Sequence, residues 1–264
     1  MVVALHILTA ALYLGAGVVA GVGLVLPSPR ALRGSVSILL LGAVAHAFAF
    51  AAFHLAAAPP PLTDLPAAVS LMAWLAVLFF LALLRRVRLQ ALVAGVAPAA
   101  FLGAFYAALR LPHSEQALFV GSAAWPHAHV LLSSAGFALL GLAGIAGVAY
   151  LGEDRRLKAK PPGRARLRLP SLEALDRVNA VALAAGFPLL TVGVLTGMMW
   201  VETELGRLWT GSPHEIGSVL AWLVYGGLLF ARVRARQPGR RAALAAVAGF
   251  AFLLFAVVGV GLFA

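Results

Sequence analysis

The sequence contains no cysteine, which excludes disulfides, thiolate metal ligands and thiol redox chemistry. Any metal or cofactor therefore has to be held by histidine, methionine, carboxylate or backbone groups. Charged residues are also scarce: they make up 11% of the 264 residues, whereas 62% are hydrophobic, and the mean hydropathy is +0.98. Soluble globular domains lie far from these values, so the composition predicts a polytopic membrane protein.

Several catalytic signatures are absent as well. The chain has no nucleotide-binding glycine motif and no His-Glu-x-x-His helix. The pair His214-Glu215 has no third metal ligand at a recognisable spacing, which disfavours a zinc hydrolase. The carboxylates lie near the ends of the apolar segments, whereas transporters with midplane ion sites usually carry them inside the spans. We therefore expect a protein that is not an enzyme.

Eight segments are apolar over about 20 residues, the length that crosses a bilayer. They cover residues 2–26, 34–57, 64–84, 89–109, 125–151, 176–200, 214–232 and 241–263. This pattern predicts an all-α bundle of about eight transmembrane helices, forming a single integral membrane domain over residues 1–264. Residues 1–151 hold the first five spans and 176–264 the last three. The basic stretch 152–175, with Pro-Pro-Gly at 161–163, is predicted to be a cytoplasmic linker between them.

The basic residues are distributed very unevenly between the two sets of loops. Eighteen of the twenty Lys and Arg residues fall in one set, and the other set keeps only Arg110 and Arg207. The positive-inside rule makes the first set cytoplasmic and places both termini outside. This orientation in an anionic membrane already explains the net charge of +11, so no nucleic-acid partner is needed.

The histidines concentrate on the opposite side from the basic residues. Six of the seven lie at or near outer helix ends or in outer loops, namely His6, His54, His113, His127, His129 and His214. The seventh, His46, lies near the middle of the second span. Because exposed cytoplasmic loops are the cheapest place for a polar residue, their lack of histidine indicates that the chemistry belongs to the outer half.

His46 is the most deeply placed ionisable residue in the sequence. A charged imidazole at that depth would cost at least a few kcal/mol, so His46 should be neutral. Neutral imidazole is a good axial ligand for haem iron, and histidine is the default ligand in a chain without cysteine. The alternative is a core histidine that is hydrogen-bonded to a backbone carbonyl or to Ser70.

The fifth span begins with Trp125-Pro126-His127-Ala128-His129-Val130. His127 and His129 point about 200° apart on a helix, so they cannot ligate one metal from the same face. His129 should face a neighbouring helix across small side chains, a surface that could accept a flat macrocycle, and His127 is the better candidate for an exposed or loop-facing role. The alternative is an interfacial Trp/His belt that only anchors the helix. The spacings Gly17-x-x-x-Gly21 and Gly193-x-x-x-Gly197 predict close helix packing.

Motifs along nearly the whole chain resemble the cytochrome c assembly protein family of the CcsA/CcmC type, most closely its eight-span HemX/YpjD-like subgroup. The matching stretches are His46 in the second span, Ser70-Leu71-x-x-Trp74, Trp125-x-x-x-His129-Val130, Leu175-Asp176-x-x-Asn179, Gly186-Phe187-Pro188-x-x-Thr191, Ala221-Trp222-Leu223-Val224-Tyr225 and Gly239-Arg240-Arg241-Ala242-Ala243. Their order and spacing together make the resemblance specific.

The resemblance implies haem bound between a transmembrane histidine and outer histidines, next to a tryptophan-rich outer loop. This chain departs from the family in that loop, at residues 206–215, where the second Trp and the Asp of the family pattern are missing. Phe230 occupies the position of a second transmembrane histidine, and the outer histidine after the last helix is also missing. His214 is our candidate to replace one of these ligands.

The resemblance therefore predicts a haem-binding or haem-handling protein of cytochrome c biogenesis in the bacterial inner membrane, carrying non-covalent, b-type haem. The predicted site residues are His129 and His46 as iron ligands, with His127, His214, Trp125 and Trp209 around them. Expected partners are haem, lipid and cytochrome c biogenesis subunits. The alternative is a HemX-like regulator or scaffold that no longer delivers haem and binds a tetrapyrrole-synthesis enzyme through residues 155–168.

Overall fold

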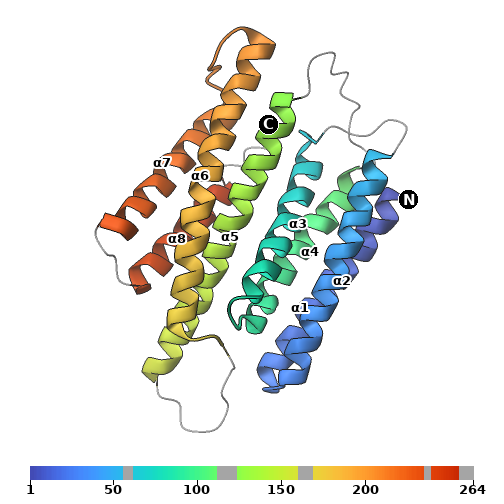
Figure 1. Ribbon diagram of the computed structural model, residues 1–264, viewed down its shortest axis with the longest axis vertical. Helices are drawn as coiled ribbons and strands as arrows, with labels where there is room; N and C mark the ends of the chain where they lie inside the picture. Colours follow the sequence, from blue (N-terminus) through green and yellow to red (C-terminus); the bar gives the residue numbers. More distant parts are fainter. Residues whose placement is uncertain (56–61, 112–123, 160–168, 235–238, 256–264) are drawn as a thin grey trace. The chain divides into compact units, whose positions relative to one another are not determined.

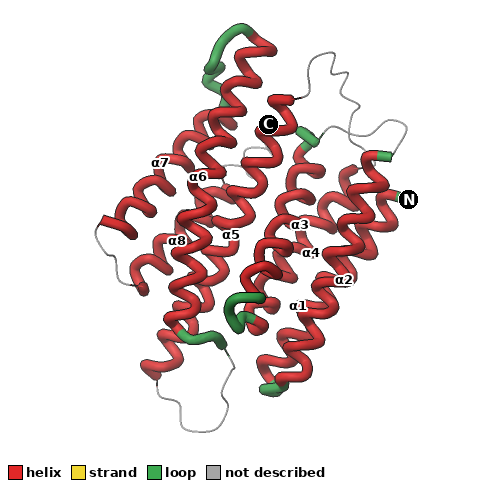
Figure 2. Tube along the Cα trace, viewed as in Figure 1, coloured by secondary structure: helices red, strands yellow, loops and turns green. Residues whose placement is uncertain are grey.

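The computed structural model describes residues 1–55, 62–111, 124–159, 169–234 and 239–255, and every regular element in these ranges is helical (Figures 1 and 2). The helices are α1 (Val2–Val25), α2 (Pro29–His54), α3 (Leu65–Leu84), the short 3-10 helix η1 (Gln90–Leu92), α4 (Val93–Arg110), α5 (Ala124–Ala159), α6 (Leu172–Leu205), α7 (Pro213–Arg234) and α8 (Gly239–Leu254). The predicted all-α fold is confirmed.

Seven of the described helices are long and apolar enough to cross a membrane: α1 to α3, η1 together with α4, and α5 to α7. The chain is thus a multi-pass helical membrane protein. For α8 the structure describes 16 residues, and the last part of the predicted eighth span lies outside the described residues. Large apolar side chains such as Leu40, Leu41 and Phe48 are exposed, as expected of helix faces that contact lipid. The orientation with both termini outside stays a prediction.

The chain forms two compact units. Unit 1 contains residues 1–118 and 155–174, and hence α1 to α4, while unit 2 contains residues 119–154 and 175–264, and hence most of α5 and α6 together with α7 and α8. We predicted the division after the fifth span, whereas α5 groups with the last three helices. The polar stretch 152–175 suggested a boundary, but polarity along the chain does not show which helices pack together.

Helix α5 also continues to Ala159, well past the predicted end of the span at residue 151. The added segment consists mostly of good helix formers. Arg156 and Lys158 lie in the last turn, where a positive charge interacts favourably with the helix dipole and stabilises the helix. At the start of the added segment, Asp154 forms an ion pair with Arg240 at the start of α8 (3.5 Å). The predicted linker is therefore partly helix, and residues 160–168 lie outside the described residues.

Small residues allow close helix packing in unit 1. A Cβ atom at Gly17 would lie 3.0 Å from Cγ of Pro98 in α4, and one at Gly42 in α2 would lie 2.6 Å from Cε1 of Tyr13 in α1. The packing role predicted for Gly17 is confirmed. Gly21 has open space around it, so the close contact involves only the first glycine of the predicted pair.

Unit 2 packs in the same way and adds an ion pair at one end. A Cβ atom at Gly136 in α5 would lie 2.8 Å from the backbone nitrogen of Leu190 in α6, and one at Gly147 would lie 2.8 Å from the carbonyl oxygen of Ala243 in α8. Where α6 begins and α7 ends, Arg232 donates to both carboxylate oxygens of Asp176 (2.8 and 2.7 Å). These contacts hold together the helices of unit 2 that carry the candidate site.

Candidate functional site

A pocket of about 180 Å³ lies in unit 2 where the start of α5, the end of α6 and the start of α7 meet. Its lining includes four side chains that can bind or stack on a ligand, namely His129, Trp200, Trp209 and His214, and the thioether of Met198. Three of the predicted site residues, His129, Trp209 and His214, are therefore brought together. Trp200 and Met198 were not predicted, although each lies within three residues of Gly197 in the predicted packing motif.

The His129 imidazole is held in a defined orientation. Its Nδ1 lies 2.8 Å from the carbonyl oxygen of Gly193, and because a carbonyl can only accept, Nδ1 carries the proton. In the neutral ring Nε2 then carries a lone pair, and it makes no hydrogen bond with any described residue. Protein metal sites commonly orient a histidine ligand by this kind of bond from the other ring nitrogen.

The Gly193-x-x-x-Gly197 spacing makes room for this imidazole. A Cβ atom at Gly197 would lie 2.7 Å from Nδ1 of His129 and 2.9 Å from its Cε1, and a Cβ atom at Gly193 would lie 2.5 Å from Oγ of Ser133. All three distances are shorter than real Cβ contacts. The packing role predicted for these glycines is confirmed, and it also seats the His129 ring against the backbone of α6.

Aromatic rings and an ordered loop complete the pocket. The Trp200 ring lies 6.0 Å from the His129 ring at an interplanar angle of 44°, and the Trp209 side chain is 43% exposed. The loop that carries Trp209 begins at Gly206 and contains Gly211, and both have positive φ (66° and 78°), a conformation that glycine adopts without strain. Figure 2 shows this loop in green between α6 and α7.

The carboxylate of Glu215 fixes the loop to the start of α7. It accepts hydrogen bonds from the backbone nitrogens of Thr210 (2.8 Å) and Gly211 (2.9 Å) and from the Thr210 hydroxyl (2.7 Å). In return, the Glu215 nitrogen donates to Oγ of Ser212 (3.3 Å), the residue before α7. This is a variant of the capping box, with proline at the first helical position. The Glu215 carboxylate is therefore hydrogen-bonded to the loop at both of its oxygens.

The other predicted residues of the fifth span do not line this pocket. His127 is exposed and Trp125 half-buried. The different surroundings of His127 and His129 follow from their angular separation on α5, as predicted. Within the described ranges, no three His, Cys, Asp or Glu side chains form a group that could hold a metal ion.

His46 lies in unit 1, where it is fully buried and belongs to a chain of hydrogen bonds. Its Nδ1 lies 3.2 Å from the hydroxyl of Tyr13, and its Nε2 lies 2.8 Å from Oγ of Ser70. Ser70 Oγ is also 3.2 Å from Nε2 of His6, whose Nδ1 is 3.0 Å from the carbonyl oxygen of Val2. The ring of Phe50 stacks on His46 at 5.3 Å.

The carbonyl at one end sets the direction of every bond in this chain when both rings are neutral. His6 Nδ1 must donate to Val2, so His6 Nε2 accepts the only hydroxyl proton of Ser70. Ser70 Oγ must then accept from His46 Nε2, and His46 Nδ1 accepts from Tyr13. Both ring nitrogens of His46 are thus engaged, and in this arrangement neither offers a free lone pair to an iron atom. The hydrogen bond to Ser70 is the alternative that the sequence left open.

Several other motif residues also link helices through hydrogen bonds. Trp74 donates to the carbonyl of Ala43 (3.0 Å), and Asn179 donates to that of Ala143 (2.9 Å). Trp222 donates to the hydroxyl of Thr191 (2.9 Å). Each of these bonds joins two different helices within one unit. These residues therefore have a structural reason for their positions that does not involve a ligand.

Comparison with known proteins places the chain in a family. The family model described as cytochrome C assembly protein matches residues 62–264. Proteins named cytochrome c biogenesis protein CcsA are similar: those of Trichormus variabilis and Thermosynechococcus vestitus are 36% identical and that of Microcystis aeruginosa 35%, each over 95 residues. These matches cover 36% of this chain and 27%, 30% and 29% of the three relatives, respectively, which is under a third of each relative's length. The narrower HemX/YpjD-like assignment stays a prediction. The family model, which covers more than three quarters of the chain, shows that this protein belongs to the cytochrome c assembly protein family.

Proposed function

We propose that this protein is a haem-binding component of cytochrome c biogenesis that handles haem without transforming it, in the inner membrane of a bacterium. Family membership supports the process, and the pocket supports the ligand. The observation that carries the proposal is the His129 ring, whose Nδ1 is fixed on Gly193 and whose Nε2 is left without a partner among the described residues.

The residues of the outer pocket fit part of a haem group. Haem supplies an iron centre that takes an axial imidazole, and the macrocycle needs flat apolar or aromatic walls. His129 would hold the iron, Trp200 and Trp209 would form walls against the macrocycle, and His214 would be a candidate second ligand. The volume of about 180 Å³ is below the roughly 300–1,000 Å³ of ordinary ligand pockets, so only one edge of the macrocycle would be enclosed. Without cysteine the haem would be held non-covalently.

The surroundings of His46 do not fit a haem group in the same way. The ring is fully buried, stacked on Phe50 and hydrogen-bonded at both nitrogens. We therefore assign no ligation to His46, and the proposal rests on His129.

Haem titration of the detergent-purified protein, followed by its Soret absorbance and a pyridine haemochrome assay, tests the proposal. We expect His129→Ala to weaken haem binding by at least about tenfold. Removing a residue that only orients a metal ligand costs about 10–100-fold in affinity, and removing the ligand itself should cost no less. His127→Ala is the matched control, because it removes an exposed imidazole two residues away. His46→Gln should leave the Soret band unchanged. The proposal is wrong if the wild type binds no haem, or if His129→Ala and His127→Ala bind it equally.

A second candidate function is regulation of tetrapyrrole synthesis, in the manner that the HemX/YpjD-like resemblance implies. The small pocket and the missing Trp and Asp of the outer loop favour it. Residues 155–168, which contain seven Lys and Arg and no acid, would bind the partner enzyme. Recovery of a tetrapyrrole-synthesis enzyme with the solubilised wild type, but not with a variant neutralised in this stretch, would support regulation, and recovery of cytochrome c biogenesis subunits would support the first candidate.

A further inference from the structure

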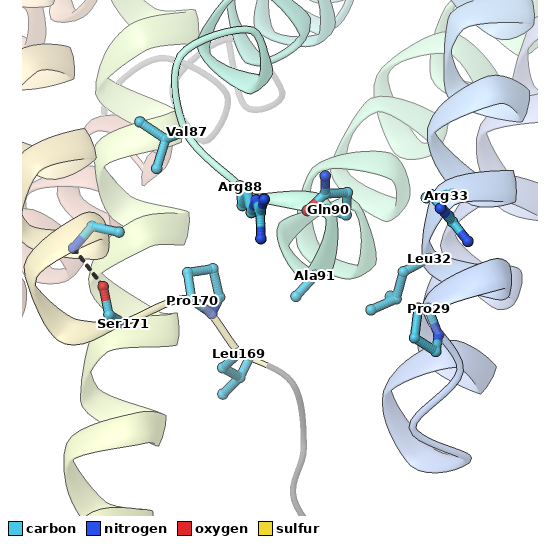
Figure 3. A pocket seen from close by; sticks show the side chains of 11 residues that line it. Pro29, Leu32, Arg33, Val87, Arg88, Gln90, Ala91, Leu169, Pro170 and Ser171 are labelled. Carbon is cyan, nitrogen blue, oxygen red and sulfur yellow. Dashed lines mark hydrogen bonds between the residues drawn. The ribbon is translucent and has the colours of Figure 1, made fainter.

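A second pocket lies in unit 1, at the end of the unit opposite the Val2 end of α1. It has a volume of about 730 Å³ and is enclosed by the start of α2, the turn between α3 and α4, and residues 169–174 before and at the start of α6. Figure 3 shows Arg33 and Arg88 at the pocket, with Gln90 between them. By the distribution of basic residues, this end faces the cytoplasm.

The pocket carries two positive charges and no acid. Arg33 and Arg88 line it, no Asp or Glu does, and neither guanidinium forms an ion pair or a hydrogen bond with any described residue. Two arginines of unit 2, in contrast, are paired: Arg232 with Asp176 and Arg240 with Asp154. Residues 155–171 contain no acid, and Glu173 in the first turn of α6 is not part of the lining. Both arginine side chains are exposed, so an anionic ligand can reach them from outside the protein.

The rest of the lining is largely apolar. Leu32 and Pro170 are buried, and Pro29, Val87 and Leu169 add further apolar surface. A free inorganic anion would use the guanidiniums but not this surface. The pocket contains no His, Met or Tyr, so it offers no usual protein ligand to a haem iron. An anionic head attached to an apolar body satisfies both kinds of lining, and basic pockets between helices on the cytoplasmic side are where lipid head groups bind.

We propose that this pocket binds the phosphate head group of an anionic phospholipid of the cytoplasmic leaflet, with Arg33 and Arg88 on the phosphate and the apolar lining against the glycerol and upper acyl chains. The two arginines come from α2 and from the turn after α3, so a bound lipid would bridge these elements. Its role is independent of the haem binding proposed for unit 2.

Native mass spectrometry of the full-length protein, titrated with phosphatidylglycerol or phosphatidylcholine, tests the proposal. We expect the double variant Arg33→Gln/Arg88→Gln to bind phosphatidylglycerol about 30-fold more weakly, which corresponds to about 1 kcal/mol for each arginine near the membrane surface. The matched control is Arg30→Gln/Arg86→Gln, which removes the same charge from neighbouring positions that do not line the pocket. It should bind within about twofold of the wild type, and Arg33→Lys/Arg88→Lys should keep part of the affinity.

Three results would overturn the proposal. The first is equal binding of phosphatidylcholine, which would show an apolar lipid contact only. The second is an equal loss in the Arg30/Arg86 control, which would show a general effect of surface charge. The third is full displacement of phosphatidylglycerol by millimolar inorganic phosphate or by haem, which would identify a soluble anion or a porphyrin carboxylate as the ligand. The single variants Arg33→Gln and Arg88→Gln provide the same comparison if the double variant cannot be purified.

Discussion

The hydrogen-bond chain of unit 1 predicts that Ser70 contributes more to stability than its size suggests. Ser70 Oγ is the centre of the chain, since it accepts from His46 and donates to His6. Ser70→Ala removes both bonds and leaves a buried donor and a buried acceptor without a partner. Tyr13→Phe removes only the terminal bond to His46. The direction of the bonds therefore predicts a larger loss for Ser70→Ala than for Tyr13→Phe.

The expected magnitudes follow from interhelical hydrogen bonds in membrane proteins. Such bonds contribute on average about 0.6 kcal/mol and at most about 1.7 kcal/mol each, and an orphaned buried polar group costs about 1–3 kcal/mol. With two bonds lost, Ser70→Ala should lower the free energy of unfolding by about 1–3 kcal/mol. Tyr13→Phe should lower it by about 0.5–1.5 kcal/mol. Both side chains are fully buried, so solvent cannot replace the lost partner easily.

The assay is reversible unfolding of the purified protein in mixed micelles with increasing SDS, followed by helical circular dichroism. Thr9→Val is the matched control. Thr9 is also fully buried and lies in α1, but its hydroxyl has no hydrogen-bond partner among the described residues, so replacing it should change stability by less than about 0.5 kcal/mol. Equal effects of Ser70→Ala and Thr9→Val would refute the reasoning, because the loss would then come from packing alone.

Three further predictions concern unit 2. Gly197→Ala places a Cβ atom 2.7 Å from His129 Nδ1 and should weaken haem binding in the titration described above, whereas Gly227→Ala, with open space around it, should not. Glu215→Gln weakens the acceptor that orders the loop, so Trp209 fluorescence should become more accessible to iodide quenching; an unchanged quenching constant would contradict this role. Asp176→Asn weakens the pair with Arg232 and should lower the free energy of unfolding by at most about 1 kcal/mol, because both side chains are partly exposed; a loss above about 2 kcal/mol would contradict it.

Hydrophobic run lengths predicted the spanning helices closely, because the bilayer requires about 20 apolar residues whatever the tertiary structure is. The third segment, for example, was predicted at 64–84 and is found at Leu65–Leu84. The end of α5 was placed eight residues too early. The apolar run of α5 ends where the charged residues begin, but the helix continues because its backbone hydrogen bonds do not depend on contact with lipid.

The partners of the site residues were harder to predict than the residues themselves. His129 was selected because an imidazole at a helix entrance is unusual, and its contact with Gly193 follows only from how α5 packs on α6. Tyr13 was missed, although it lies seven residues after His6 and therefore on the same face of α1. The spacing Ser212-x-x-Glu215 is a capping signature that predicts the start of α7 at residue 213, and it was missed. For the contacts of His129 and Tyr13 the decisive information was the neighbouring helix, which a single sequence does not contain, whereas the capping signature is local and could have been read from the sequence.

The contrast between His46 and His129 bears on where this chain would do its chemistry. In both imidazoles one nitrogen is hydrogen-bonded to a fixed partner. A glycine makes space at each site: Gly197 for the His129 ring, and Gly42 for Tyr13, the partner of His46. They differ in the second nitrogen, which at His46 donates to Ser70 and at His129 faces a pocket. A ligand atom approaching His46 would have to break a buried hydrogen bond and find room where none of the described pockets lies. His129 lines the pocket of unit 2 and makes no second hydrogen bond with a described residue, so the proposed iron ligation rests on His129 and not on His46.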